Sequence, residues 1–261
     1  MPVSLFHRKP APKRVAGKLG RIRGRSAPVD YLPLSDYLAD PLPLHPAADD
    51  FTSGRTDWGM FGNDTLGDCG FAGRYHYDMA NAWTAKEAAL PQDAAVQNAV
   101  AQAYLDYNHG QDVGVDLASV LQFWLTHDLA GLPTIGGFAQ VSLGGSEFAS
   151  ALHVFGGLYT GVLISNEAMQ EFQNGEAWSS TATDWAGGHC VPVLARNTRY
   201  GEAITWGAVQ RFTWEWWQAC REEAWVIFTP EQMKAPKGIF NGVNVKQLAK
   251  DIKALHGVTA A

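Results

Sequence analysis

Two short runs of the sequence carry residues that can act as a thiol nucleophile and its base. Cys69 follows Asn63 by six positions and Gly67 by two, and His189 stands far downstream at the head of an apolar stretch. A cysteine attacks a carbonyl as its thiolate, which a helix N-terminus and an adjacent imidazole both favour. The spacing therefore predicts nucleophilic chemistry at Cys69, with His189 as the proton acceptor.

Each of these residues also has an ordinary structural explanation. A lone cysteine is most often a buried core residue, and a lone histidine before an apolar strand usually satisfies a core hydrogen bond. Cys190 should face away from His189 on a strand, in the core. A metal site built from Cys69, His189 and Cys190 lacks C-x-x-C and H-x-x-x-H spacings, so we expect neither a metal ion nor a cofactor.

These residues need elements to position them. The run from Cys69 to about Lys86 has one apolar helical face, which places Cys69 at a helix N-terminus, where the helix dipole favours a thiolate. Other helices are expected at residues 91–107, 116–129, 146–155, 167–172, 214–222 and 244–256. Strands are expected at residues 138–143, 158–164, 189–196, 203–207 and 224–228. Helices first and strands second predict an α+β protein with two facing halves.

The composition predicts a folded, soluble protein. Of 261 residues, 46% are hydrophobic and 10 are Trp, which is ample for a core. The sequence has no stretch of about 20 apolar residues and no apolar centre of a secretory signal peptide near its start, so we expect a cytoplasmic location in the producing cell. The three cysteines are too few and odd in number for a disulfide framework.

The first 29 residues form a basic arm on an acidic body. The arm has no Asp or Glu, and its eight basic residues are Arg8, Lys9, Lys13, Arg14, Lys18, Arg21, Arg23 and Arg25. The rest of the chain holds 12 Lys and Arg against 26 Asp and Glu. Such an arm is either a solvated tail or the ligand of an anionic partner: nucleic acid, an acidic neighbouring subunit, or its own acidic body.

The residues quoted above resemble the papain-like (C1-type) cysteine peptidases over roughly residues 58–229. The closest likeness is to uncharacterised papain-like proteins of actinobacteria and tailed phages. The resemblance implies a two-lobed fold with an N-terminal helical half and a C-terminal antiparallel β half. In that family a Gln six positions before the nucleophile donates to the oxyanion hole, and Asn63 stands at its place. By this likeness Cys69 is the nucleophile, His189 the base, and Asn63 an oxyanion donor together with the Cys69 N–H.

The likeness breaks at the residue that orients the histidine. The family carries Asn-Ser-Trp-Gly, whereas this chain has Ile204-Thr205-Trp206-Gly207, and an isoleucine cannot accept a hydrogen bond from imidazole. Thr205 or Asp184 is expected to take over that role, with Trp206 covering the ring. The cleft should be lined by Trp58, Gly67, Asp68, Gly188 and Trp206. A carboxylate beside the thiol, as at Asp68, disfavours the thiolate unless it points to solvent.

Two functions from different classes follow from these observations. The first is a papain-fold cysteine peptidase-like protein that hydrolyses a peptide or amide bond of a peptide or protein substrate. The alternative is a catalytically weak or inactive structural protein, such as a phage virion or assembly component in an oligomer, whose arm binds neighbouring subunits or nucleic acid. We expect the arm and its lead-in at residues 1–55, the papain-like domain at 56–230 and a C-terminal extension with one amphipathic helix at 231–261.

Overall fold

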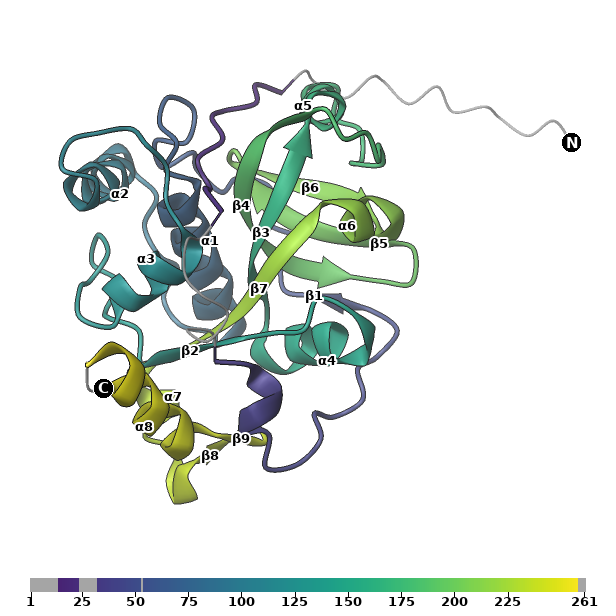
Figure 1. Cartoon of the computed structure of the whole chain (residues 1–261). Helices are drawn as coiled ribbons and strands as arrows, with labels where there is room; N and C mark the ends of the chain where they lie inside the picture. Colours follow the sequence, from purple (N-terminus) through teal and green to yellow (C-terminus); the bar gives the residue numbers. More distant parts are fainter. Residues whose placement is uncertain (1–13, 24–31, 53, 258–261) are drawn as a thin grey trace, which may run out of the picture.

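The computed structural model describes residues 14–23, 32–52 and 54–257, and Figure 1 shows how they are arranged. The arm residues Arg8, Lys9, Lys13 and Arg25 lie outside these ranges. In the described chain a helical half comes first and an antiparallel sheet follows. This order confirms the predicted α+β class.

Three helices make up the helical half: α1 (Cys69–Thr84), α2 (Ala94–Tyr107) and α3 (Leu117–Trp124). The Asp93 carboxylate accepts hydrogen bonds from the first N–H groups of α2, and Asp116 caps α3 in the same way. Side-chain caps of this kind satisfy N–H groups that have no partner inside the helix. They explain why α2 begins at Ala94 rather than at the predicted Pro91.

Helix α1 is buried along most of its length, and two glycines let it approach its neighbours closely. A Cβ at Gly73 would lie 2.9 Å from the Cys190 Sγ, and a Cβ at Gly70 would lie 2.6 Å from a methyl of Val115. The N-terminal turn of α1, which carries Cys69, is therefore pressed against the sheet.

The sheet half is built on seven antiparallel strands of the described chain, in the order β2-β7-β3-β4-β5-β6 with β1 paired to β4. Their bounds are β1 (Asp49–Asp50), β2 (Gly137–Gln140), β3 (Leu158–Ser165), β4 (Trp185–Arg196), β5 (Tyr200–Thr205), β6 (Ala208–Thr213) and β7 (Arg221–Phe228). The connecting helices are α4 (Gly145–Phe155), α5 (Asn166–Gln173) and α6 (Trp214–Cys220). His189 lies within β4, opposite Val162 of β3.

The sheet differs from its prediction around the β5–β6 hairpin. The predicted strand 203–207 runs through Trp206 and Gly207, but these two residues form the turn, with φ of 44° and 70°. Two-residue hairpin turns of this hand need positive φ at both positions. Strand β6 follows the turn and was not predicted. Strand β4 begins at Trp185, ahead of the predicted start at His189.

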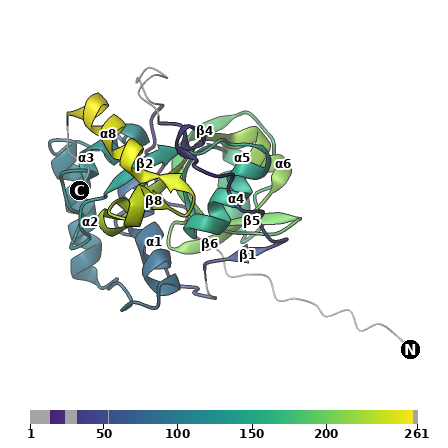
Figure 2. The same ribbon diagram turned by 90° about the horizontal axis from the view of Figure 1, so that it is seen from below.

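The C-terminal segment packs at the end of the molecule below α3 and β2, where Figures 1 and 2 show it in yellow. It consists of α7 (Pro230–Met233), the 3₁₀ turn η3 (Pro236–Gly238), β8 (Ile239–Phe240), β9 (Val243–Asn244) and α8 (Val245–His256). The Tyr37 hydroxyl of the turn η2 (Leu34–Tyr37) donates to Asp251 of α8 at 3.0 Å. Among the described helices, none is both long and apolar enough to cross a membrane.

Candidate active site

Cys69 is the first residue of α1, and its thiol is enclosed. The residue is 1% exposed, and the backbone N–H of Cys190 donates to its Sγ at 3.4 Å. Burial raises the pKa of Cys69 to about 12, although the N–H groups of Cys190 and Gly20 favour the thiolate. In this structure desolvation outweighs both the helix dipole and the two donors, so the thiol is protonated at neutral pH.

His189 is also fully buried, and a hydroxyl holds its ring. Its Nε2 lies 2.6 Å from the Thr205 Oγ1, and the Trp206 indole stacks on the imidazole with centroids 4.6 Å apart. The Nδ1 atom is buried and has no hydrogen-bond partner in the described part of the chain. Burial lowers the pKa of His189 to about 3. In the tautomer with the ring proton on Nε2, Thr205 accepts that proton and Nδ1 is the nitrogen left with a free lone pair.

The peptide bond after His189 lies at the thiol, because the Cys190 N–H that contacts the Cys69 Sγ belongs to it. Of the two residues expected to orient the ring, Thr205 makes the contact. Asp184 instead accepts from the Asn166 side chain at 3.1 Å. The thiol, the imidazole and the hydroxyl thus come from α1, β4 and the end of β5.

Asn63 lies on the chain just before α1, with its side-chain amide buried. Its Nδ2 donates to the carbonyl of Leu66 at 3.0 Å and to the carbonyl of Lys18 at 3.1 Å. The Trp206 indole N–H donates to the same Lys18 oxygen at 3.2 Å. A peptide carbonyl from the basic arm therefore lies on the group expected to stabilise an oxyanion.

This carbonyl belongs to a stretch of the arm, residues 14–23, which we call the arm segment. It runs between α1 and α3 on one side and the sheet on the other, as the dark purple trace in Figure 1 shows. The Arg21 N–H donates to the Gly188 carbonyl at 3.0 Å, and the Val115 N–H donates to the Gly20 carbonyl at 2.7 Å. The arm segment is therefore hydrogen-bonded to the sheet half and to the helical half at once.

Two glycines of the arm segment sit where no side chain fits. A Cβ at Gly17 would lie 1.9 Å from the backbone carbonyl oxygen of Asn63, and a Cβ at Gly20 would lie 1.7 Å from that of Gly67. Contacts this short cannot exist in a folded chain without displacing backbone. The arm segment closes over the thiol because its backbone can approach so closely.

The described basic residues of the arm all find partners on the same chain. Lys18 pairs with Asp112 at 2.9 Å, Arg23 pairs with Glu222, and Arg21 pairs with both Glu222 and Glu223. Arg14 donates to the Val209 carbonyl and to the Gln210 side chain, each at 3.1 Å, and stacks on Phe172. Lys18, Arg21 and Arg23 thus pair with carboxylates of the chain's own acidic body, one of the three anionic partners weighed for the arm.

Three residues expected to line the cleft contact the arm segment, namely Gly67, Gly188 and Trp206. Asp68 does not point to solvent. It is fully buried before α1, and burial raises its pKa to about 8. A carboxyl that keeps its proton at neutral pH penalises the neighbouring thiolate less than a charged one does.

Trp58 is buried next to the turn that carries Trp206. It is 1% exposed, its indole donates to the Arg55 carbonyl, and its ring meets His76 edge-on at 6.2 Å. None of the contacts described for it reaches the arm segment. Its backbone N–H donates to the Gly207 carbonyl at 3.3 Å, beside Trp206, and its place on a cleft wall stays a prediction.

Sequence reasoning missed the acidic partners of the arm, which are Asp112, Glu222 and Glu223. A signal was present in the charge asymmetry, because an arm of +8 on an acidic body calls for carboxylates near it. The two adjacent glutamates stand at the start of β7, where one of two neighbours must face inward. A buried glutamate at such a position needs a cation.

The described residues contain no group of three or more His, Cys, Asp or Glu side chains arranged to hold a metal ion.

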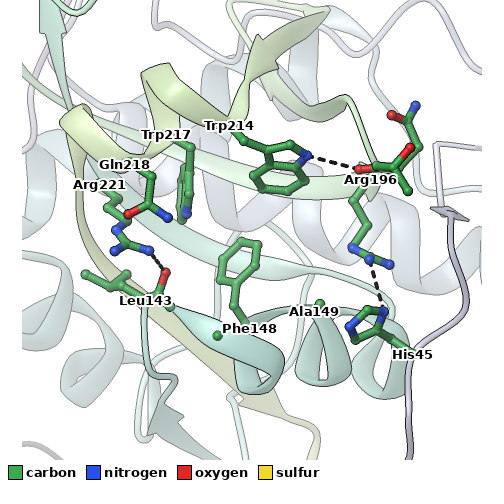
Figure 3. Close-up of a pocket in the computed structure, with 13 residues that line it drawn as sticks. His45, Leu143, Phe148, Ala149, Arg196, Trp214, Trp217, Gln218 and Arg221 are labelled. Carbon is green, nitrogen blue, oxygen red and sulfur yellow. Dashed lines mark hydrogen bonds between the residues drawn. The ribbon is translucent and has the colours of Figure 1, made fainter.

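The described residues also form a pocket of about 260 Å³ between α4 and α6, away from the thiol, which is shown in Figure 3. There Arg196 bonds to His45, and Arg221 donates to the Leu143 carbonyl. None of the candidate catalytic residues lines this pocket.

Comparison with solved structures identifies the fold. Xylellain, a cysteine protease from Xylella fastidiosa, superposes with a TM-score of 0.61 at 12% identity, over 84% of this chain and 98% of its own. Digestive procathepsin L 3 of Tenebrio molitor gives 0.52 at 13% identity, over 82% and 76%. The proform of the ragweed pollen cysteine protease Amb a 11 also gives 0.52 at 13%, over 76% and 70%. The chain thus has a papain-like two-lobed fold.

No family model matches the sequence. No curated protein matches it either.

Proposed function

We propose that the protein is a cysteine peptidase-like hydrolase of peptide or amide bonds. Cys69 attacks the carbonyl, His189 takes the thiol proton at Nδ1 and returns it to the leaving amine, and Thr205 orients the ring. Asn63 and the Cys69 N–H stabilise the oxyanion. The shorter asparagine side chain reaches a peptide oxygen, since its Nδ2 already lies 3.1 Å from the Lys18 carbonyl.

One observation carries this proposal: an extended peptide lies across the thiol. The arm segment places a carbonyl on the Asn63 amide, and its Gly20 N–H lowers the pKa of the Cys69 thiol. Its backbone is held from both sides, by Val115 and by Gly188. A site that accepts the chain's own polypeptide in this way has the shape and the donors to accept another.

The arm segment also keeps this site inactive. It occupies the oxyanion donors and excludes water from the thiol and the imidazole, whose pKa values of about 12 and about 3 favour the neutral pair. Displacement of the arm segment would admit water and substrate. It would also let the helix dipole and the imidazole stabilise the thiolate.

A single substitution in the arm segment tests the proposal without touching a candidate catalytic residue. In Gly20→Ala the new Cβ would lie 1.7 Å from the Gly67 oxygen, so the arm segment cannot seat. We expect iodoacetamide to alkylate Cys69 at least about tenfold faster at pH 7 than in the wild type. Digestion of an unbiased peptide library, read by mass spectrometry, should then reveal cleavage.

Two controls frame this test. Ile22→Ala changes a half-exposed side chain of the same segment and should leave Cys69 as unreactive as in the wild type. Gly20→Ala combined with Cys69→Ser should cleave nothing. If Gly20→Ala exposes a reactive Cys69 and still cleaves no peptide, the protein is not a peptidase.

The second candidate is a papain-fold structural protein without turnover, such as a virion or assembly component. It is favoured by the closed site, in which the thiol has a pKa of about 12. In this function the arm would exchange its own acidic body for the carboxylates of a neighbouring subunit or for phosphates of a nucleic acid. The library digestion separates the two candidates, because only the first one cleaves.

A further inference from the structure

The side chain of Arg21 fills a pocket beside the thiol that the proposed chemistry does not use. Arg21 is 6% exposed, its Nε donates to Glu223 at 2.6 Å, and its Nη1 binds Glu222. Its backbone N–H donates to Gly188, the residue before His189. The N–H of the preceding residue, Gly20, lowers the pKa of the Cys69 thiol. The pocket is therefore one residue away from the reacting groups.

The pocket is built for a flat guanidinium. A Cβ at Gly161 of β3 would lie 2.3 Å from the Arg21 Nε and 2.8 Å from the Glu223 side chain. The absence of a side chain there leaves a slot between β3 and the two glutamates of β7. Donors from two different nitrogens of one guanidinium reach two different carboxylates, an arrangement that a lysine ammonium cannot reproduce.

The pocket also requires a cation. Glu223 is 7% exposed, and one of its oxygens accepts from the Trp225 indole at 2.8 Å while the other accepts from Arg21. Burial raises the pKa of Glu223, and the charge of Arg21 opposes that rise. A buried carboxylate that loses its cation is strongly unfavourable. When the arm segment leaves, the group that replaces it gains most by bringing another guanidinium.

We propose that Glu222, Glu223 and Gly161 form a specificity pocket that selects peptides with an arginine next to the residue held at the thiol. This inference rests on the proposed function for the hydrolysis of such peptides, while binding in the pocket can be measured without it. Arg21 of the arm segment is then the internal ligand of the pocket that a substrate displaces.

Binding is tested on the full chain with Gly20→Ala, Arg21→Ala and Cys69→Ser, in which the arm segment can neither seat nor compete. The probe is a fluorescent peptide of residues 17–23, in parallel with the same peptide carrying citrulline, a neutral arginine analogue, at position 21. We expect the arginine peptide to bind at least about tenfold more tightly. Adding Glu223→Gln should remove this preference. Equal affinity of both peptides overturns the proposal.

Two safeguards keep the result clear. Glu222→Gln replaces the second carboxylate and should reduce the same preference if Glu223→Gln fails to fold, as judged by circular dichroism. Lysine at position 21 of the peptide should restore only part of the affinity. If the lysine peptide binds as tightly as the arginine peptide, the pocket recognises positive charge alone and does not select arginine.

Hydrolysis is tested on Gly20→Ala/Arg21→Ala with Cys69 intact. Cleavage of arginine peptides at least about tenfold faster than of citrulline peptides supports the specificity pocket. Cleavage of both at one rate means that the pocket only anchors the arm segment, which overturns the inference but leaves the hydrolase. An arginine preference in binding without any cleavage supports the pocket and refutes the proposed function.

Discussion

At the scale of single residues, the site and the papain-like pattern differ in the side-chain atom that contacts the histidine ring. Thr205 lies one position after the residue that the family pattern aligns, and its hydroxyl still reaches the His189 Nε2 at 2.6 Å. The side chain at 204, an isoleucine, is buried in the core instead. Neighbours in a strand point to opposite faces, so Thr205 reaches the ring only because β5 ends there and turns.

Replacing Thr205 by valine removes the hydroxyl and keeps the shape. The His189 Nε2 would be left buried without a partner, at a cost of about 1–3 kcal/mol. We expect Gly20→Ala/Thr205→Val to lose about 10- to 100-fold in kcat/KM on peptides relative to Gly20→Ala. Thr205→Ser keeps the hydroxyl and should retain most activity. Equal loss in the valine and serine variants would contradict an orienting role.

Asp68 should make stability depend on pH in an unusual direction. Burial raises its pKa to about 8 in the folded chain, from an ordinary value of 3.8. The folded state then holds a proton that the unfolded state has released, so stability falls as the pH rises from about 4 to about 8. The slope is at most about 1.4 kcal/mol per pH unit.

Urea denaturation at pH 5 and pH 8 measures this effect. Asp68→Asn should lose less stability than the wild type between the two values, since its side chain carries no charge at either. Asp64→Asn removes an exposed carboxylate nearby and should follow the wild type. If Asp68→Asn shows the wild-type pH dependence, Asp68 does not carry that proton.

At the scale of elements, periodicity predicted those that bury one regular face. The prediction of a helix beginning at Cys69 and of strands near β3 and β7 is confirmed. Strand β6 was missed because its burial alternates but its hydrophobicity does not: polar Gln210 is buried, whereas Val209 is only partly buried. The turn at Trp206 was missed because tryptophan rarely adopts positive φ. Contact between Arg21 and Glu223 depends on packing across the chain, which no local pattern encodes.

The Trp206–Gly207 turn is the element that aims the indole at His189. Gly207 has φ of 70°, and a Cβ there would also lie 3.3 Å from the Gly59 oxygen. Gly207→Ala should lower the free energy of unfolding by about 1 kcal/mol or more. Gly110→Ala is the matched control, with φ of 81° and no neighbour within 4 Å.

Both glycine variants should lose stability through backbone strain, as measured in urea. Only Gly207→Ala should also change the site, because it shifts the indole that stacks on His189 and donates to the Lys18 carbonyl. Faster Cys69 alkylation in Gly207→Ala than in Gly110→Ala is therefore expected. The same rate in both would show that the turn does not position Trp206.

At the scale of the whole molecule, the arm segment joins the two halves through charge as well as backbone. The pair between Lys18 and Asp112 is exposed, with 54% of the lysine side chain accessible, whereas Arg21 is almost fully enclosed. Exposed pairs are weak and are screened by salt, while a buried charge that loses its partner is costly. The contacts of Arg21 should therefore contribute most to keeping the arm segment bound in the site.

Substitution of each residue by alanine tests this ranking. Lys18→Ala should speed Cys69 alkylation by no more than about fivefold, because an exposed pair contributes at most about 1 kcal/mol. Arg21→Ala should speed Cys69 alkylation clearly more than Lys18→Ala does. Raising the salt concentration should mimic Lys18→Ala and leave the Arg21 contacts nearly intact. A larger effect of Lys18→Ala than of Arg21→Ala would reverse the ranking.

Because the arm segment is part of the same chain, in the proposed hydrolase it would compete with every incoming peptide at a fixed local concentration. For a short tether that concentration is of the order of millimolar, however dilute the protein is. The apparent affinity for an added peptide falls in proportion to the fraction of molecules that are open. Dilution cannot relieve this competition. An assay at micromolar substrate would therefore find the wild-type protein inert, whatever the intrinsic rate of its open site.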